Sequence, residues 1–118
     1  MKRVNELWEQ MIPMIKEIKE RSVAYIREQL EIAENNSISF RDENDEAIDG
    51  CGVCVTYDGG NHPEYAANPY SDVYGVYMKD DNIFIHCEDC VAYPLEYMEW
   101  MDIFDVADFI YTNINHEG

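Results

Sequence analysis

Basic residues are scarce in this chain of 118 residues, which has eight Lys and Arg against 25 Asp and Glu and a formal net charge of −17. Nucleic acids and anionic membrane surfaces are polyanions, so this balance argues against unaided binding to either. Long apolar runs are also absent, because none approaches the roughly 20 residues that a membrane span needs. The start, MKRVNELWEQ, has Glu6, Glu9 and Gln10 where a secretory signal would be apolar. We therefore expect a cytoplasmic protein.

Apolar and aromatic residues are not scarce: 47% of the chain is hydrophobic, with nine Tyr, four Phe and two Trp. Disordered acidic chains are poor in such residues, so we expect a folded protein. The length predicts a single domain over 1–118. Within it we predict a charge-neutral helical part over 1–35, an acidic β-rich part over 36–98 and an acidic C-terminal helix over 99–118.

The net charge is concentrated in the last two thirds of the chain. Residues 1–41 contain seven basic and seven acidic side chains, whereas residues 42–118 contain 18 acidic ones and a single base, Lys79. Surfaces usually mix both signs of charge, so this separation exceeds what solubility requires. Parts of such different charge usually face different surroundings.

The neutral part has the spacing of a long amphipathic helix. Pro13 interrupts this pattern, so we predict a short first helix and a main helix from about 14 to 34, ended by Asn35 and Asn36. The apolar stripe is expected to pack against the core, and the alternatives are a coiled coil or a membrane-surface helix. A membrane-surface helix would need a basic polar face, which this helix lacks. Its members recur at steps of three and four residues: Val4, Leu7, Trp8, Met11, Ile12, Ile15, Ile18, Tyr25, Ile26 and Ala33.

The middle of the chain predicts short antiparallel strands, and the end predicts a second helix. The turn at 79–81 indicates a hairpin between two of the strands, and the helical period returns from Asp102 to Asn115. The order of elements predicts an α+β fold, with an antiparallel sheet of about four strands and helices on one face. The expected strands are Ser37–Phe40, Gly52–Tyr57, Val73–Met78, Asn82–Cys87 and a weaker one near Leu95–Met98.

The four cysteines form two C-x-x-C pairs, Cys51 with Cys54 and Cys87 with Cys90, separated by 32 residues. Two such pairs can supply four thiolates to a structural zinc ion. The spacer is longer than in a tight zinc ribbon, and acidic neighbours surround both pairs. The alternatives are buried thiols that pack as small hydrophobic groups, or disulfide and redox chemistry. We expect no cofactor, with one structural zinc as the alternative.

The loop YDGGNHPEY brings together residue types that are common in active sites. Asp58, His62 and Glu64 could be acid–base groups or ligands. The same string is typical of a tight turn after a strand, in which Asp and Asn side chains bond to their own backbone. No nucleophile motif or phosphate loop accompanies it. We therefore treat an enzyme as a second alternative to an interaction protein.

Acidic side chains recur at regular steps near the C-terminus. On a helix, carboxylates three residues apart lie about 5–6 Å from one another, a separation that resembles neighbouring phosphates of nucleic acid. Such a surface can occupy a basic groove on another protein, as an inhibitor or a DNA mimic would, and complementary charge would accelerate the encounter. The predicted partner-binding residues are Glu88, Asp89, Glu99, Asp102, Asp105 and Asp108.

The strings VTYDGGNHPEYAANPYSDVYGVY, DDNIFIHCED and YPLEYM, over roughly residues 50–98, resemble small uncharacterised acidic proteins of bacterial mobile elements. The resemblance implies a bacterial cytoplasmic setting and brings no activity or site residues with it. From charge, we expect a non-enzymatic interaction protein with a basic, nucleic-acid-binding protein as its partner. The first alternative is a zinc-stabilised binding module that uses the two cysteine pairs.

Overall fold

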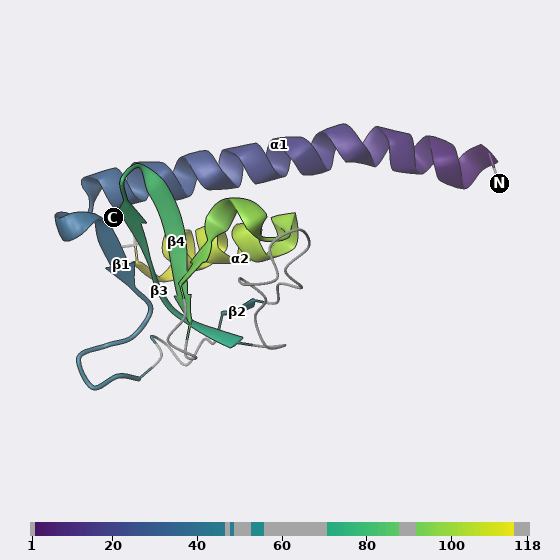
Figure 1. The fold of residues 1–118 in the computed structure, drawn as a ribbon. Helices are drawn as coiled ribbons and strands as arrows, with labels where there is room; N and C mark the ends of the chain where they lie inside the picture. The colour runs from purple at the N-terminus through teal and green to yellow at the C-terminus, as the bar shows by residue number, and fades with distance from the viewer. Residues whose placement is uncertain (1, 47, 49–52, 56–70, 88–91, 115–118) are drawn as a thin grey trace.

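The computed structural model describes residues 2–46, 48, 53–55, 71–87 and 92–114. They form an N-terminal helix, an antiparallel sheet and a C-terminal helix, which confirms the predicted α+β arrangement (Figure 1). The sheet has the strand order β1-β3-β4-β5, and the short β2 pairs with β3. The elements are α1 (Lys2–Ile32), β1 (Ser37–Ser39), β2 (Cys54–Val55), β3 (Ser71–Lys79), β4 (Asn82–Cys87), β5 (Ala92–Pro94) and α2 (Trp100–Phe109).

Helix α1 runs through Pro13 without a break, so the predicted division into two helices is wrong. Proline lacks the N–H that would bond to the carbonyl of Glu9, four residues earlier. Both residues are exposed, and water can therefore bond to that carbonyl. The predicted end of the helix is confirmed, because α1 stops at Ile32 and Asn35 and Asn36 have φ angles of 63° and 55°.

The predicted hairpin joins β3 to β4. Asp80 and Asp81, the two turn residues, have φ angles of 52° and 71°, the backbone that a type I′ turn requires. A side chain of α1 holds the tip of this turn: Arg27 donates a hydrogen bond of 3.1 Å to the backbone carbonyl of Asp81. The hairpin is thereby fixed against the C-terminal half of α1.

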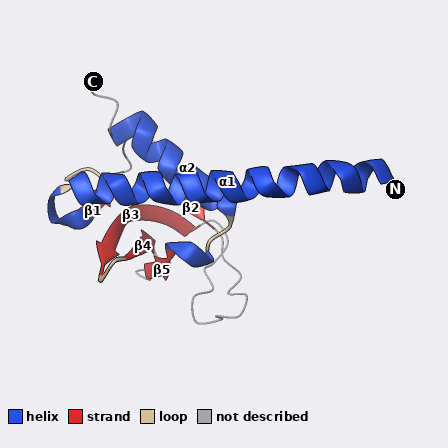
Figure 2. Ribbon diagram, turned by 90° about the horizontal axis from the view of Figure 1, so that it is seen from above, coloured by secondary structure: helices blue, strands red, loops and turns tan. Residues whose placement is uncertain are grey.

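Alternation along the strands gives the sheet one buried face and one open face. In β4, Ile83, Ile85 and Cys87 are buried, whereas Phe84 and His86 are half-buried on the other face. Helices α1 and α2 both lie on the buried face (Figure 2). This arrangement confirms the expectation that the helices cover one face of the sheet.

Both helices and the sheet contribute to one hydrophobic core. The rings of Phe40 and Phe109, whose centroids are 4.4 Å apart, connect the chain after β1 to the end of α2. The largest fully buried side chains of the described residues are Tyr93, Phe40, Ile26, Leu30, Ile85, Ile103, Ile110, Val76, Val106 and Cys87.

Two predicted strands differ from the structure. The weak strand expected near Leu95–Met98 is wrong: β5 lies earlier, at Ala92–Pro94, and Leu95–Tyr97 is a short 3-10 turn. Pairing explains the shift, because Ala92 and Pro94 lie opposite His86 and Phe84 of β4. Of the strand expected at 52–57, the described residues include 53–55, and Cys54–Val55 form β2.

The C-terminal helix begins at Trp100, slightly before the predicted start, and continues beyond α2 as the wider turn Ile110–Ile114. Its apolar face is confirmed, because side chains at the predicted three- and four-residue steps are buried in the core. These are Ile103, Val106, Ala107 and Ile110.

Helix α1 extends well beyond the sheet and α2 at its N-terminal end (Figure 1). In its C-terminal half, Ile26 and Leu30 are fully buried, whereas Leu7 and Trp8 are 54% and 56% exposed. The expectation that the whole stripe packs against the core is therefore wrong for the N-terminal half. The physical reason is length: 31 helical residues span about 46 Å, whereas the nine residues of β3, the longest strand described, span about 30 Å.

Candidate interaction surfaces

Helix α2 presents carboxylates to solvent on the side opposite the core. Asp105 and Asp108 are exposed, Asp102 is half-buried, and Glu99 caps the start of the helix with its backbone carbonyl, 3.1 Å from the amide nitrogen of Ile103. Four of the six predicted partner-binding residues therefore lie along one helix. The other two, Glu88 and Asp89, lie outside the described residues.

The carboxyl group of Asp105 lies in an unfavourable environment for its charge. Partial burial and, to a smaller extent, the nearby carboxylate of Asp108 raise the pKa of Asp105 above that of a free aspartate. A cation that approached from outside would stabilise the ionised form of this carboxyl group.

Large apolar side chains lie among these carboxylates. Met101, Phe104 and Tyr111 are 55%, 46% and 62% exposed. The sequence reasoning missed them, although the helical period places them away from the buried Ile103 and Val106. We call Asp102, Asp105, Asp108, Met101, Phe104 and Tyr111 the α2 outer face.

A shallow groove of about 240 Å³ separates this face from α1. Arg21 and Tyr25 line its α1 side, whereas Phe104, Asp108 and Tyr111 line the other side. The rings of Tyr25 and Tyr111 meet edge to face with centroids 6.3 Å apart. The α2 outer face is thus continuous with a second apolar and charged surface on α1.

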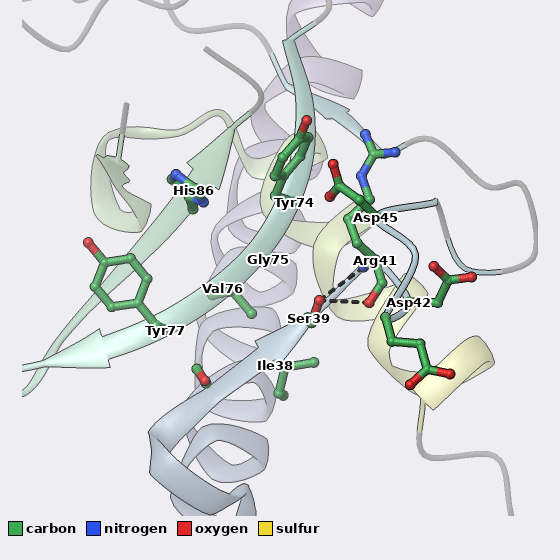
Figure 3. A pocket seen from close by; sticks show the side chains of 12 residues that line it. Ile38, Ser39, Arg41, Asp42, Asp45, Tyr74, Gly75, Val76, Tyr77 and His86 are labelled. Atoms are coloured by element: carbon green, nitrogen blue, oxygen red, sulfur yellow. Dashed lines mark hydrogen bonds between the residues drawn. The ribbon is translucent and has the colours of Figure 1, made fainter. Parts of the chain in front are cut away.

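The open face of the sheet holds a shallow hollow of about 620 Å³. Figure 3 shows Tyr74, Tyr77 and His86 on the side of the sheet that faces away from the helices. Gly75 lies between the two tyrosines, and a Cβ atom there would lie 2.7 Å from the backbone oxygen of Ile38. The close approach of β1 therefore requires glycine at this position.

One cation already occupies part of this hollow. The guanidinium carbon of Arg41 lies 4.4 Å from the centre of the Tyr74 ring, and its Nη2 lies 3.9 Å from a carboxylate oxygen of Asp72. Asp42 and Asp45 stand at the rim. Aromatic rings with carboxylates around them accept cationic side chains, as Arg41 itself illustrates.

The β3 strand brings one cysteine of each pair to the same end of the sheet. Cys54 of β2 pairs with Asp72, and Cys87 of β4 pairs with the next residue, Val73. Cys87 is fully buried. The other two cysteines, Cys51 and Cys90, lie outside the described residues. Among the described residues, no group of three metal-ligating side chains occurs.

The loop residues Asp58, His62 and Glu64 also lie outside the described part of the chain. The enzyme alternative that depends on them therefore stays a prediction.

Among the helices that the structure describes, none is long and apolar enough to cross a membrane. No protein-family model, curated protein or solved structure is similar to this chain at a significant level.

Proposed function

We propose that this chain is a non-enzymatic interaction protein whose α2 outer face binds a basic protein partner. The observation that carries the proposal is the alternation on one helix of exposed carboxylates, Asp105 and Asp108, with the exposed apolar side chains of Met101, Phe104 and Tyr111. Lys and Arg side chains combine an aliphatic stem with a charged end, so they can cover both kinds of group at once.

The charge distribution supports the same class of partner. Residues 42–118 contain 18 acidic side chains and one basic one, so the field around α2 repels acidic proteins and attracts basic ones. Partial burial and the carboxylate of Asp108 raise the pKa of Asp105, and a partner's cation placed there would stabilise its ionised form. The steps of three residues between the aspartates match the spacing of a phosphate track. A basic groove that normally holds nucleic acid is the partner surface that fits best.

A direct test titrates the chain with a helical peptide of alternating Lys and Leu segments and follows the backbone amides by NMR. We expect the largest shifts over residues 99–111, and smaller ones on the open face of the sheet. Replacing Asp102, Asp105 and Asp108 by Asn should weaken binding about tenfold, because ion pairs between exposed charges are worth roughly 0.2–1 kcal/mol each. Equal shifts over the whole surface would contradict the proposal.

A matched control removes the same number of charges elsewhere. Glu9, Glu17 and Glu20 lie on the solvent side of α1, and all three are exposed. Their replacement by Gln should change the affinity for the peptide much less than the three Asn substitutions in α2. If both triple variants lose affinity equally, net charge alone governs binding and the α2 outer face has no special role.

A second candidate function is a zinc-stabilised binding module. It is favoured by the pairing of Cys54 and Cys87 with consecutive residues of β3, which places one cysteine of each C-x-x-C pair at one end of the sheet. If all four thiolates bind zinc, the purified protein should contain about one zinc per chain, and chelation should lower its melting temperature. Metal-free protein with an unchanged melting curve would eliminate this candidate.

A further inference from the structure

The N-terminal half of α1 carries a large uncovered apolar surface. All but one of the large exposed hydrophobic side chains in the described part of the chain lie there or on the α2 outer face. Trp8 and Ile12 precede the buried Ile26 and Leu30 by five full helical turns, so they lie on the same side of α1. The uncovered surface therefore continues the stripe that packs against the core at Trp8 and Ile12, and Leu7, Met11 and Met14 extend it along the neighbouring side of the helix. Its exposed members are Leu7, Trp8, Met11, Ile12 and Met14.

We propose that this uncovered surface binds the same surface of a second copy of this chain, as an antiparallel pair of α1 helices. Val4, Leu7, Met11, Met14 and Ile18 alternate between steps of three and four residues, which is the heptad spacing of a coiled coil. A self-complementary helix needs no other protein to cover it. The pair leaves the α2 outer face available for the basic partner.

The charge of α1 does not oppose pairing with a second copy, and the charge of the rest of the chain fixes the orientation of the pair. Within Lys2–Ile32 there are six basic and six acidic residues, so α1 has no net charge, whereas the rest of the chain is strongly acidic. A parallel pair would place the two acidic bodies, meaning the sheet and α2 of each copy, side by side. An antiparallel overlap of residues 4–18 places them at opposite ends, separated by about 20 Å of helix. This separation exceeds the screening length of about 8 Å at physiological salt.

The area fits a weak, reversible pair. Leu7, Met11 and Met14 lie in the heptad seam and Trp8 lies beside it, and each of these side chains is about half exposed and offers on the order of 100 Å². Two copies would therefore bury about 800 Å² through these side chains, which is the size of a weak, transient interface. We accordingly expect a reversible dimer that forms at micromolar concentrations rather than an obligate one.

The test is sedimentation equilibrium of the full chain over a range of concentrations. We expect a monomer–dimer equilibrium that strengthens slightly as salt rises, because salt screens the repulsion between the acidic bodies. Replacing Leu7, Met11 and Met14 by Gln should raise the dissociation constant at least about 100-fold. Gln has a helix propensity similar to that of Leu and Met, so α1 should persist. The control with Gln at positions 9, 17 and 20 should dimerise as well as the unchanged chain.

The fluorescence of Trp8 gives a second readout, in the chain with its dimer seam unchanged. Trp8 is 56% exposed, so dimerisation should shift its emission to shorter wavelength and reduce its quenching by acrylamide as concentration rises, relative to a Trp8→Phe chain. A monomer at every concentration would overturn the proposal. So would a dimer that survives the three Gln substitutions, larger open-ended assemblies, or a monomer that binds lipid vesicles through Trp8. None of these results bears on peptide binding at α2.

Discussion

The two halves of α1 should respond very differently to the same substitution. Ile26 is fully buried between α1 and the sheet, whereas Ile12 is 48% exposed on the projecting half. Ile26→Ala removes buried methyl and methylene groups and leaves a cavity, which typically costs about 2–5 kcal/mol. Ile12→Ala removes groups that contact no core, so its effect on the free energy of unfolding should stay within about 0.5 kcal/mol.

The comparison is controlled internally, because both substitutions are in one helix and both gain the same helix propensity, a few tenths of a kcal/mol. Urea denaturation followed by circular dichroism, at concentrations where the chain is a monomer, measures the two free energies of unfolding. We expect the Ile26→Ala midpoint to fall strongly and the Ile12→Ala midpoint to stay within error of the unchanged chain. Equal losses would refute the reasoning, since they would show that the N-terminal half also packs against the core.

Two further substitutions test the sheet and the α2 outer face. Gly75→Ala should lower the free energy of unfolding by about 1–3 kcal/mol, because its Cβ would lie 2.7 Å from the backbone oxygen of Ile38; an unchanged urea midpoint would show that β1 can move. Asp105→Asn should raise the melting temperature at pH 7, because the raised pKa means that folding disfavours the ionised carboxyl group. That gain should fade as pH falls through the raised pKa of the folded state, and it should disappear below the ordinary aspartate value of about 3.9, where the carboxyl group becomes protonated in both states. The exposed Glu96→Gln serves as its control, and a gain that persists in acid would contradict the assignment.

The sequence pattern predicted the elements whose signals lie in residues close together in the chain. The hairpin was predictable because Asp80 and Asp81 tolerate left-handed backbone and lie between two β-rich runs. The buried face of α2 followed from the spacing of Ile103, Val106 and Ile110. Fold class, strand order in the chain and the acidic helix could therefore be predicted from local signals.

Other features depend on contacts between distant elements. An apolar stripe predicts that one face of a helix will be covered, but it does not indicate how far the covering elements extend. Helix α1 is longer than the sheet that it packs against, so Trp8 stays exposed. Pro13 is tolerated because its side of the helix faces solvent, which no local rule indicates. The need for glycine at position 75 arises from the close approach of β1 to β3, a pairing between segments far apart in the sequence.

The salt dependence of peptide binding tests the central claim most directly. The affinity of the Lys-rich peptide should be measured over a series of salt concentrations for the unchanged chain, the Asn variant at 102, 105 and 108, and the Gln variant at 9, 17 and 20. We predict that affinity falls steeply with salt for the unchanged chain and the Gln variant, and that the Asn variant is both weaker and less sensitive to salt. An affinity that does not change with salt, or the same salt dependence in all three proteins, would contradict the assignment of α2 as the binding surface.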